Sequence, residues 1–170
     1  MFSFGLQGAP RRFPALPRAA WFFHASPENH LSLRNDLPGN GFLAQSFSSP
    51  AIPSFLLALG ALAVPLLLSR TLTKWIRALG SKIIREDGTL LAVDPTEWHD
   101  YKLAWHPGRV EYFQDGAPVA ETTISPTGPL GLVIWIDNQF AAFTPAGKIG
   151  AGSLANPSPS WMEIADLELH

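Results

Sequence analysis

Three carboxylates lie close together near the C-terminal end of the sequence, in the stretch EIADLE at residues 163–168. Retaining glycosidases work with a pair of carboxylates about 5–5.5 Å apart, one as nucleophile and one as acid/base. The apolar residues on the two sides of Asp166 have opposite strand parity, which predicts a bulge that keeps them in the core. The carboxylates then share one outer face. We therefore interpret the stretch as a strand with a solvated acidic face, without a catalytic pair.

A second polar group lies at the end of a predicted strand, where Trp135 is followed by Asp137, Asn138 and Gln139. Planar amides and carboxylates bond sugar hydroxyls, and the face of a pyranose ring stacks on an indole. These four residues are therefore candidate carbohydrate ligands. The alternative is a turn formed by an Asp-Asn pair beside a core tryptophan.

The composition excludes several other kinds of chemistry. With no cysteine, the chain has no disulfides, thiolate metal sites or cysteine nucleophiles, although this does not choose a compartment. The histidines lack the pair spacing of a zinc site, and no P-loop, GxGxxG or Ser-His-Asp order occurs. The 12 basic and 14 acidic residues are dispersed, giving a formal net charge of -2. We therefore expect no nucleic-acid partner.

The elements that must position these groups are mostly short strands. Period-two patterns between turn residues predict a meander with turns at His106-Pro107-Gly108 and Asp115-Gly116. Near the N-terminal end, further runs predict three consecutive strands. These three cover residues 19–26, 30–37 and 41–49. The first 17 residues contain three prolines and are predicted to form an irregular arm, without the pattern of a secretory signal.

One part of the chain has a helical composition instead. No charged residue occurs from 37 to 69, Leu and Ala dominate, and basic residues then recur every three to five positions. We predict a helical insertion at about 52–82, in which Pro53 starts the first helix, Pro65 divides it and Gly80 ends the second.

The insertion has more apolar surface than the edge of a small sandwich covers, so residues 51–79 are predicted to contact a membrane surface or a partner subunit. Packing on the chain's own domain and a true membrane span are the alternatives. The candidate contact residues are Phe55, Leu59, Leu66, Leu67 and Trp75. The basic residues Arg70, Lys74, Arg77 and Lys82 are expected at the headgroups or at the rim of the interface.

The meander resembles a segment of the laminarinase-like glycoside hydrolase family 16 and of concanavalin A-like jelly rolls in general. The matching residues are His99, Tyr101, Trp105, Pro107, Tyr112, Phe113, Asp115, Gly116 and Val119. The resemblance covers residues 97–170 well, 18–49 loosely and the helical stretch not at all. It implies an all-β jelly-roll sandwich over residues 18–170, incomplete at its N-terminal end. In this sandwich residues 128–139 contain the strand that follows the meander, and residues 161–170 form the closing strand.

The resemblance also bears on chemistry. Family 16 places its catalytic carboxylates on a strand upstream of the meander, whereas no Asp or Glu occurs here between Asp36 and Glu86. The family's closing strand often supplies an aspartate to a structural calcium, which makes Asp166 a candidate calcium ligand. We therefore predict a non-catalytic binding module, most concretely a lectin-like carbohydrate-binding domain. The alternatives are a membrane-peripheral or assembly subunit and a divergent glycoside hydrolase.

Overall fold

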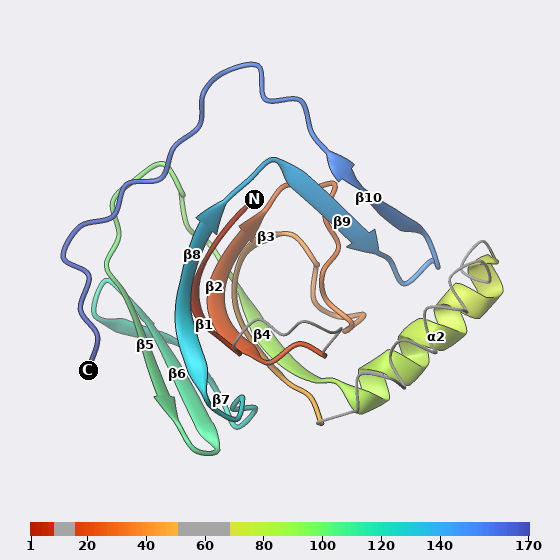
Figure 1. Cartoon of the computed structure of the whole chain (residues 1–170), viewed down its shortest axis with the longest axis horizontal. Helices are drawn as coiled ribbons and strands as arrows, with labels where there is room; N and C mark the ends of the chain where they lie inside the picture. Colours follow the sequence, from red (N-terminus) through yellow and green to blue (C-terminus); the bar gives the residue numbers. More distant parts are fainter. Residues whose placement is uncertain (9–15, 51–68) are drawn as a thin grey trace.

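The structure is a computed structural model that describes residues 1–8, 16–50 and 69–170. Its secondary structure is mostly antiparallel β-sheet (Figure 1). The largest sheet has the strand order β4-β3-β2-β1-β8. The bounds of its strands are β1 Phe2–Gly8, β2 Ala19–Ala25, β3 Gly41–Ser48, β4 Arg85–Leu91 and β8 Leu130–Ile136. The predicted all-β class is confirmed, and strands from both sides of the helical insertion join one sheet.

Five further strands form two smaller sheets. One sheet has the order β5-β6-β7 and the other is the hairpin β9-β10. Their bounds are β5 Tyr101–His106, β6 Arg109–Gln114, β7 Ala117–Thr122, β9 Gln139–Phe143 and β10 Ile149–Ser153. In Figure 1 the five-stranded sheet is curved, with β5–β7 outside the curve and β9 on its inner side. The predicted sandwich architecture is present, while the jelly-roll connectivity stays a prediction.

The N-terminal arm was predicted wrongly over residues 2–8. These residues form β1, which lies between β2 and β8 in the sheet. Apolar and small or polar residues alternate in Phe2-Ser3-Phe4-Gly5, which is a strand pattern. The prolines that suggested irregular structure begin only at position 10, so none of them interrupts the hydrogen-bond ladder of β1.

The outer face of the five-stranded sheet packs against β5–β7. Phe22 and Phe42 on this face are buried against Val110 and Tyr112 of β6. The Tyr112 hydroxyl donates a hydrogen bond to the carbonyl oxygen of Gln45 (2.8 Å) and is 2.7 Å from Ser46 Oγ. Burial raises the pKa of Tyr112 well above its usual value. This layer is the main core, and its one buried phenol is fully bonded.

The inner face of the sheet carries a second apolar cluster. Phe23, Leu43 and Leu37 are buried there, with Trp21 and Trp135 packed against them. Leu37 belongs to the segment between β2 and β3, which therefore covers part of this face. The inner face thus carries apolar and aromatic side chains along β2, β3 and β8.

The predicted meander is confirmed. Gly108 and Gly116 both have positive φ values (78° and 77°), as the two tight turns require. Asp115 also has a positive φ of 51°, and its carboxylate bonds His99 Nδ1 (2.8 Å) and the backbone N–H of Asp100 (2.9 Å). The pKa of Asp115 is lowered, mainly by the hydrogen bond with His99. His99 and Asp115, two residues of the family resemblance, therefore fasten the start of β5 to the second turn.

Two predicted strands are absent from the described part of the chain. Within residues 30–37, His30 makes an isolated β-bridge and the rest form loops and bends. Side chains satisfy backbone groups of this segment: Glu86 accepts from the N–H of Leu33, and Ser32 Oγ from that of Arg34. Residues 161–170 contain no strand, and three of the side chains expected in the core are more than half exposed. These side chains are Ile164, Leu167 and Leu169.

The described part of the helical insertion is α2, Arg70–Ile83. Its presence confirms the predicted second helix, but Gly80 does not end it. The N–H of Ile84 donates to the carbonyl of Gly80, so the last turn continues past the glycine. The first predicted helix, with Pro53 and Pro65, lies outside the described residues.

Candidate functional site

A half-buried carboxylate organises the inner side of the sheet near its β4 edge. Glu86 of β4 accepts hydrogen bonds from Ser32 Oγ, from Gln45 Nε2 (2.8 Å) and from the backbone N–H of Leu33 (2.6 Å). Ser32 and Gln45 are each only 1% exposed. Both carboxylate oxygens of Glu86 are therefore engaged in holding the 26–40 segment against the sheet, which favours a structural role.

A buried arginine ties α2 to the same region. Arg77 is 3% exposed, and its guanidinium donates to the carbonyl oxygens of Phe143 and Arg34 (3.0 Å for Arg34). It also lies over the Phe143 ring, 5.7 Å from the ring centroid. Burial lowers the pKa of Arg77, while the nearby charge of Glu86 opposes the shift. Arg77 therefore connects α2, β9 and the 26–40 segment.

His30 completes this connection. Its backbone N–H donates to Ala141 and its carbonyl accepts from Phe143, so residue 30 pairs with β9. Its Nε2 is 3.4 Å from Nη2 of Arg77. Burial, and then the charge of Arg77, lower the pKa of His30. A neutral imidazole whose Nε2 accepts a hydrogen bond from the Arg77 guanidinium is the form that suits this position.

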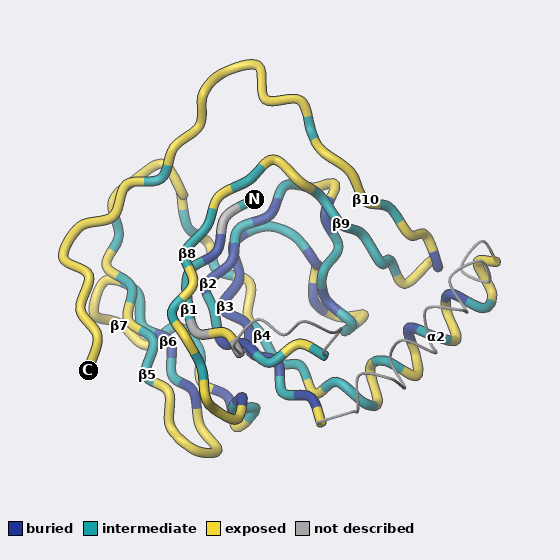
Figure 2. Tube along the Cα trace, viewed as in Figure 1, coloured by how far each residue is buried: buried dark blue, intermediate teal, exposed yellow. Residues whose placement is uncertain are grey.

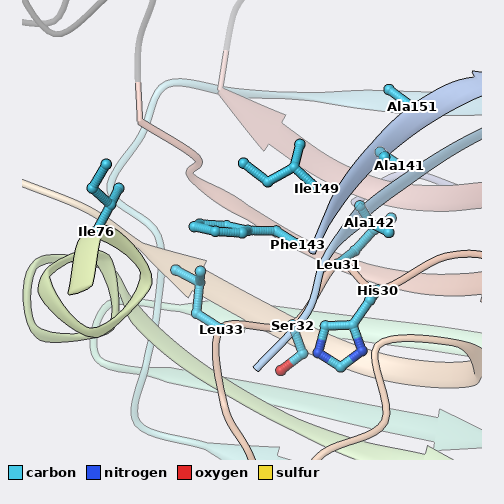
Figure 3. A pocket seen from close by; sticks show the side chains of 11 residues that line it. His30, Leu31, Ser32, Leu33, Ile76, Ala141, Ala142, Phe143, Ile149 and Ala151 are labelled. Atoms are coloured by element: carbon cyan, nitrogen blue, oxygen red, sulfur yellow. The ribbon is translucent and has the colours of Figure 1, made fainter. Parts of the chain in front are cut away.

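A pocket of about 400 Å³ opens beside this network, between α2, the 26–40 segment and the β9–β10 hairpin (Figure 3). Its wall includes Leu33, Ile76, Phe143 and Ile149, whose side chains converge in the close-up view. Ser32 also lines it, but its hydroxyl already bonds Glu86. The walls are therefore mainly apolar.

The acidic residues of the five-stranded sheet do not form a catalytic pair. The described strands of this sheet contain two carboxylates, Glu86 and Asp87, which are adjacent on β4 and so point to opposite faces. Asp87 bonds Arg34 at 2.7 Å. Within the described ranges, no group of three or more His, Asp or Glu side chains is arranged to hold a metal ion. Asp166 is exposed in a bend with a φ of 51°, and a calcium there stays a prediction.

The predicted carbohydrate ligands lie around the turn between β8 and β9. Asp137 Oδ1 accepts from the N–H of Gln139 (3.0 Å), and Asn138 Nδ2 donates to the carbonyl of Leu154 (2.9 Å). Trp135 packs on Phe23 with a ring separation of 6.4 Å. Asp137 and Asn138 thus use polar groups to hold the turn and the following segment, while the Gln139 side chain is exposed.

The exposed face of α2 is the other candidate surface. Trp75 and Leu79, one turn apart, are 64% and 43% exposed. Lys74 and Lys82 are exposed near them, whereas Arg77, expected at the rim with these lysines, is buried. That expectation was wrong because the Arg77 guanidinium has backbone carbonyls to bond beneath β9.

The other predicted contact residues, Phe55, Leu59, Leu66 and Leu67, lie outside the described residues. No helix within residues 1–8, 16–50 and 69–170 is long and apolar enough to cross a membrane.

Comparison with family models, with curated proteins and with solved structures finds no match for this chain. Sequence reasoning missed the network of Arg77, His30 and Glu86. In the sequence Arg77 is one of four basic residues of α2, and its spacing does not distinguish it from the exposed lysines. The sequence therefore gives no signal that this side chain is buried.

Proposed function

We propose that the chain is a non-catalytic interaction module that attaches to an anionic lipid surface through α2. The observation that carries this proposal is the exposed face of the helix, where Trp75 and Leu79 lie beside Lys74 and Lys82. The sequence of α2 contains four basic residues and no acidic one. A helix with exposed apolar side chains and a basic polar face suits the interface between headgroups and acyl chains.

The rest of the molecule supports this orientation of α2. Arg77, on the opposite side of the helix, is buried and bonded to β9 and to the 26–40 segment. The helix is therefore fixed to the β domain by one face while the other carries Trp75 and Leu79 outward. A surface held in this way loses little conformational entropy when it binds.

Co-sedimentation with lipid vesicles tests the proposal. The chain is expected to pellet with vesicles that contain phosphatidylglycerol, and much less with vesicles of phosphatidylcholine alone or at high salt. Trp75→Ser and Leu79→Ser should each weaken binding about tenfold or more, because burial of such a side chain is worth about 1.5–3 kcal/mol. Lys74→Gln and Lys82→Gln should each cost about 1 kcal/mol.

Trp98→Ser is the matched control, since Trp98 is 66% exposed but lies before β5, away from α2 in the sequence. It should leave binding to the vesicles unchanged. Equal binding to neutral and anionic vesicles, or equal losses for Trp75→Ser and Trp98→Ser, would contradict the proposal.

Carbohydrate binding on the inner face is a second candidate, favoured by two tryptophans. Trp21 pairs in register with Gly5, and Trp135 with Ser3, so both rings lie on the same face two strands apart. The indole N–H of Trp21 is buried without a hydrogen-bond partner among the described residues. Calorimetric titration with β-glucan oligosaccharides tests this candidate: binding should fall with Trp135→Ala and not with Trp98→Ala.

A further inference from the structure

The strand β5 has an unpaired edge within the described part of the chain, because its sheet has the order β5-β6-β7. The N–H of Asp115 donates to the carbonyl of Asp100, and the turn between β5 and β6 joins His106 to Arg109. Hydrogen-bonded positions alternate along an antiparallel pair. Lys102 and Ala104 therefore bond β6, and the residues between and beside them direct their peptide groups away from it. These residues are Tyr101, Leu103 and Trp105.

The C-terminal segment, residues 155–170, is exposed over nearly its whole length (Figure 2). Among the described residues its hydrogen bonds stay within the segment, from Ser160 to Asn156 and between His170 and Glu168. It nevertheless carries large apolar side chains that are 53–73% exposed. These are Trp161, Ile164, Leu167 and Leu169. Residues 161–169 thus have a strand-forming sequence but no strand partner among the described residues.

We propose that residues 161–169 of one copy add as a strand to the β5 edge of a second copy. Each copy presents both halves of this contact, so a reciprocal exchange pairs both edges in a closed dimer. Main-chain hydrogen bonds to Tyr101, Leu103 and Trp105 supply the attachment. The charges favour this pairing, because Lys102 lies on β5 and the added segment is acidic. Its acidic residues are Glu163, Asp166 and Glu168.

Light scattering coupled to size-exclusion chromatography, with amide hydrogen exchange at low and high protein concentration, tests the proposal. At high concentration a dimer is expected, and the amides of Tyr101, Leu103 and Trp105 should exchange about tenfold or more slowly than in dilute solution. The amides of Lys102 and Ala104, which bond β6, serve as internal controls and should be protected at both concentrations.

A pair of double variants makes the test specific. Ile164→Lys with Leu167→Lys should keep the chain monomeric and leave the outward β5 amides fast at every concentration. Asn156→Lys with Ser158→Lys adds the same charge in the same exposed segment and should still dimerise. All four positions are exposed, so none of these changes should unfold the chain.

Three results would overturn the inference. They are a monomer at all concentrations, a dimer that survives Ile164→Lys with Leu167→Lys, and protection of the outward β5 amides that does not depend on concentration. The last result would mean that the segment pairs with β5 of its own copy. The inference is independent of lipid binding by α2, since neither β5 nor residues 161–169 belong to that surface.

Discussion

Replacing Glu86 by Gln should destabilise the fold strongly, because the carboxylate accepts from three donors at once. Gln keeps one carbonyl oxygen, which can still accept from Ser32 and Gln45. Its NH₂ group then faces the N–H of Leu33, and that hydrogen bond is lost. The substitution also removes the negative charge near the buried Arg77.

The magnitude follows from these contacts. A hydrogen bond to a charged group contributes about 1.5–3 kcal/mol, and an unsatisfied buried donor costs about 1–3 kcal/mol. With one bond lost and two weakened, we expect Glu86→Gln to lower the free energy of unfolding by about 2–4 kcal/mol. For a chain of this size the melting temperature should then fall by about 4–16 °C.

Urea denaturation followed by tryptophan fluorescence measures the effect, with Glu121→Gln as the matched control. Glu121 pairs with Arg109 at 3.2 Å, and its side chain is 58% exposed, so its loss should cost about 0–1 kcal/mol. If Glu86→Gln and Glu121→Gln lower the stability equally, the carboxylate of Glu86 does not hold the 26–40 segment against the sheet, and the structural role assigned to it is wrong.

Three other substitutions probe separate parts of the fold. Tyr112→Phe should lower the stability by about 1–3 kcal/mol in urea denaturation, because it removes the hydrogen bonds of the hydroxyl and leaves the buried Ser46 Oγ without this partner. Tyr101→Phe should cost much less, because the Tyr101 hydroxyl has no hydrogen bond among the described residues. His30 has a folded-state pKa below its ordinary value of 6.5, so it contributes stability above that pH that is lost as the pH falls through the folded pKa. His30→Gln should therefore reduce the loss of melting temperature between neutral and acid pH, and an unchanged loss would show that His30 does not titrate as described. Gly116→Ala should cost about 1–2 kcal/mol by thermal melting, since φ is 77° and no atom lies within 4 Å of the added Cβ, which leaves backbone strain as the cause.

The meander, β2, β3 and α2 could be predicted because each has a local signal that its environment does not override. Asp115-Gly116 and Pro107-Gly108 determine turns at both ends of β6, and period two determines the strands between them. The same signal failed for residues 30–37. Their alternation is real, but Glu86 and Ser32 satisfy the backbone of this segment, and no sequence rule shows that a carboxylate more than 50 positions away will do so.

The predictions for residues 161–170 and for β1 failed in opposite directions for the same reason. A strand needs a neighbour, and the sequence shows only whether a segment suits a strand. Residues 161–170 have the pattern but no partner strand in the described part of the chain, so their apolar side chains are exposed. Residues 2–8 have two partners, β2 and β8, and form a central strand although prolines follow closely.

The candidate surfaces differ in how much of their chemistry is already used within the chain. At the β8–β9 turn, Asp137 and Asn138 bond backbone groups of their own chain, which leaves less polar capacity for a sugar. On the inner face, Glu86 and Arg77 are likewise occupied. The exposed side of α2 is different, because Trp75 and Leu79 have apolar area in water and the adjacent lysines keep their charge exposed. Exposure to water is unfavourable for the apolar side chains and favourable for the lysine charges. The interface between lipid headgroups and acyl chains buries the apolar side chains and keeps the charges hydrated. This difference is the physical reason for proposing lipid binding by α2 ahead of carbohydrate binding on the inner face of the sheet.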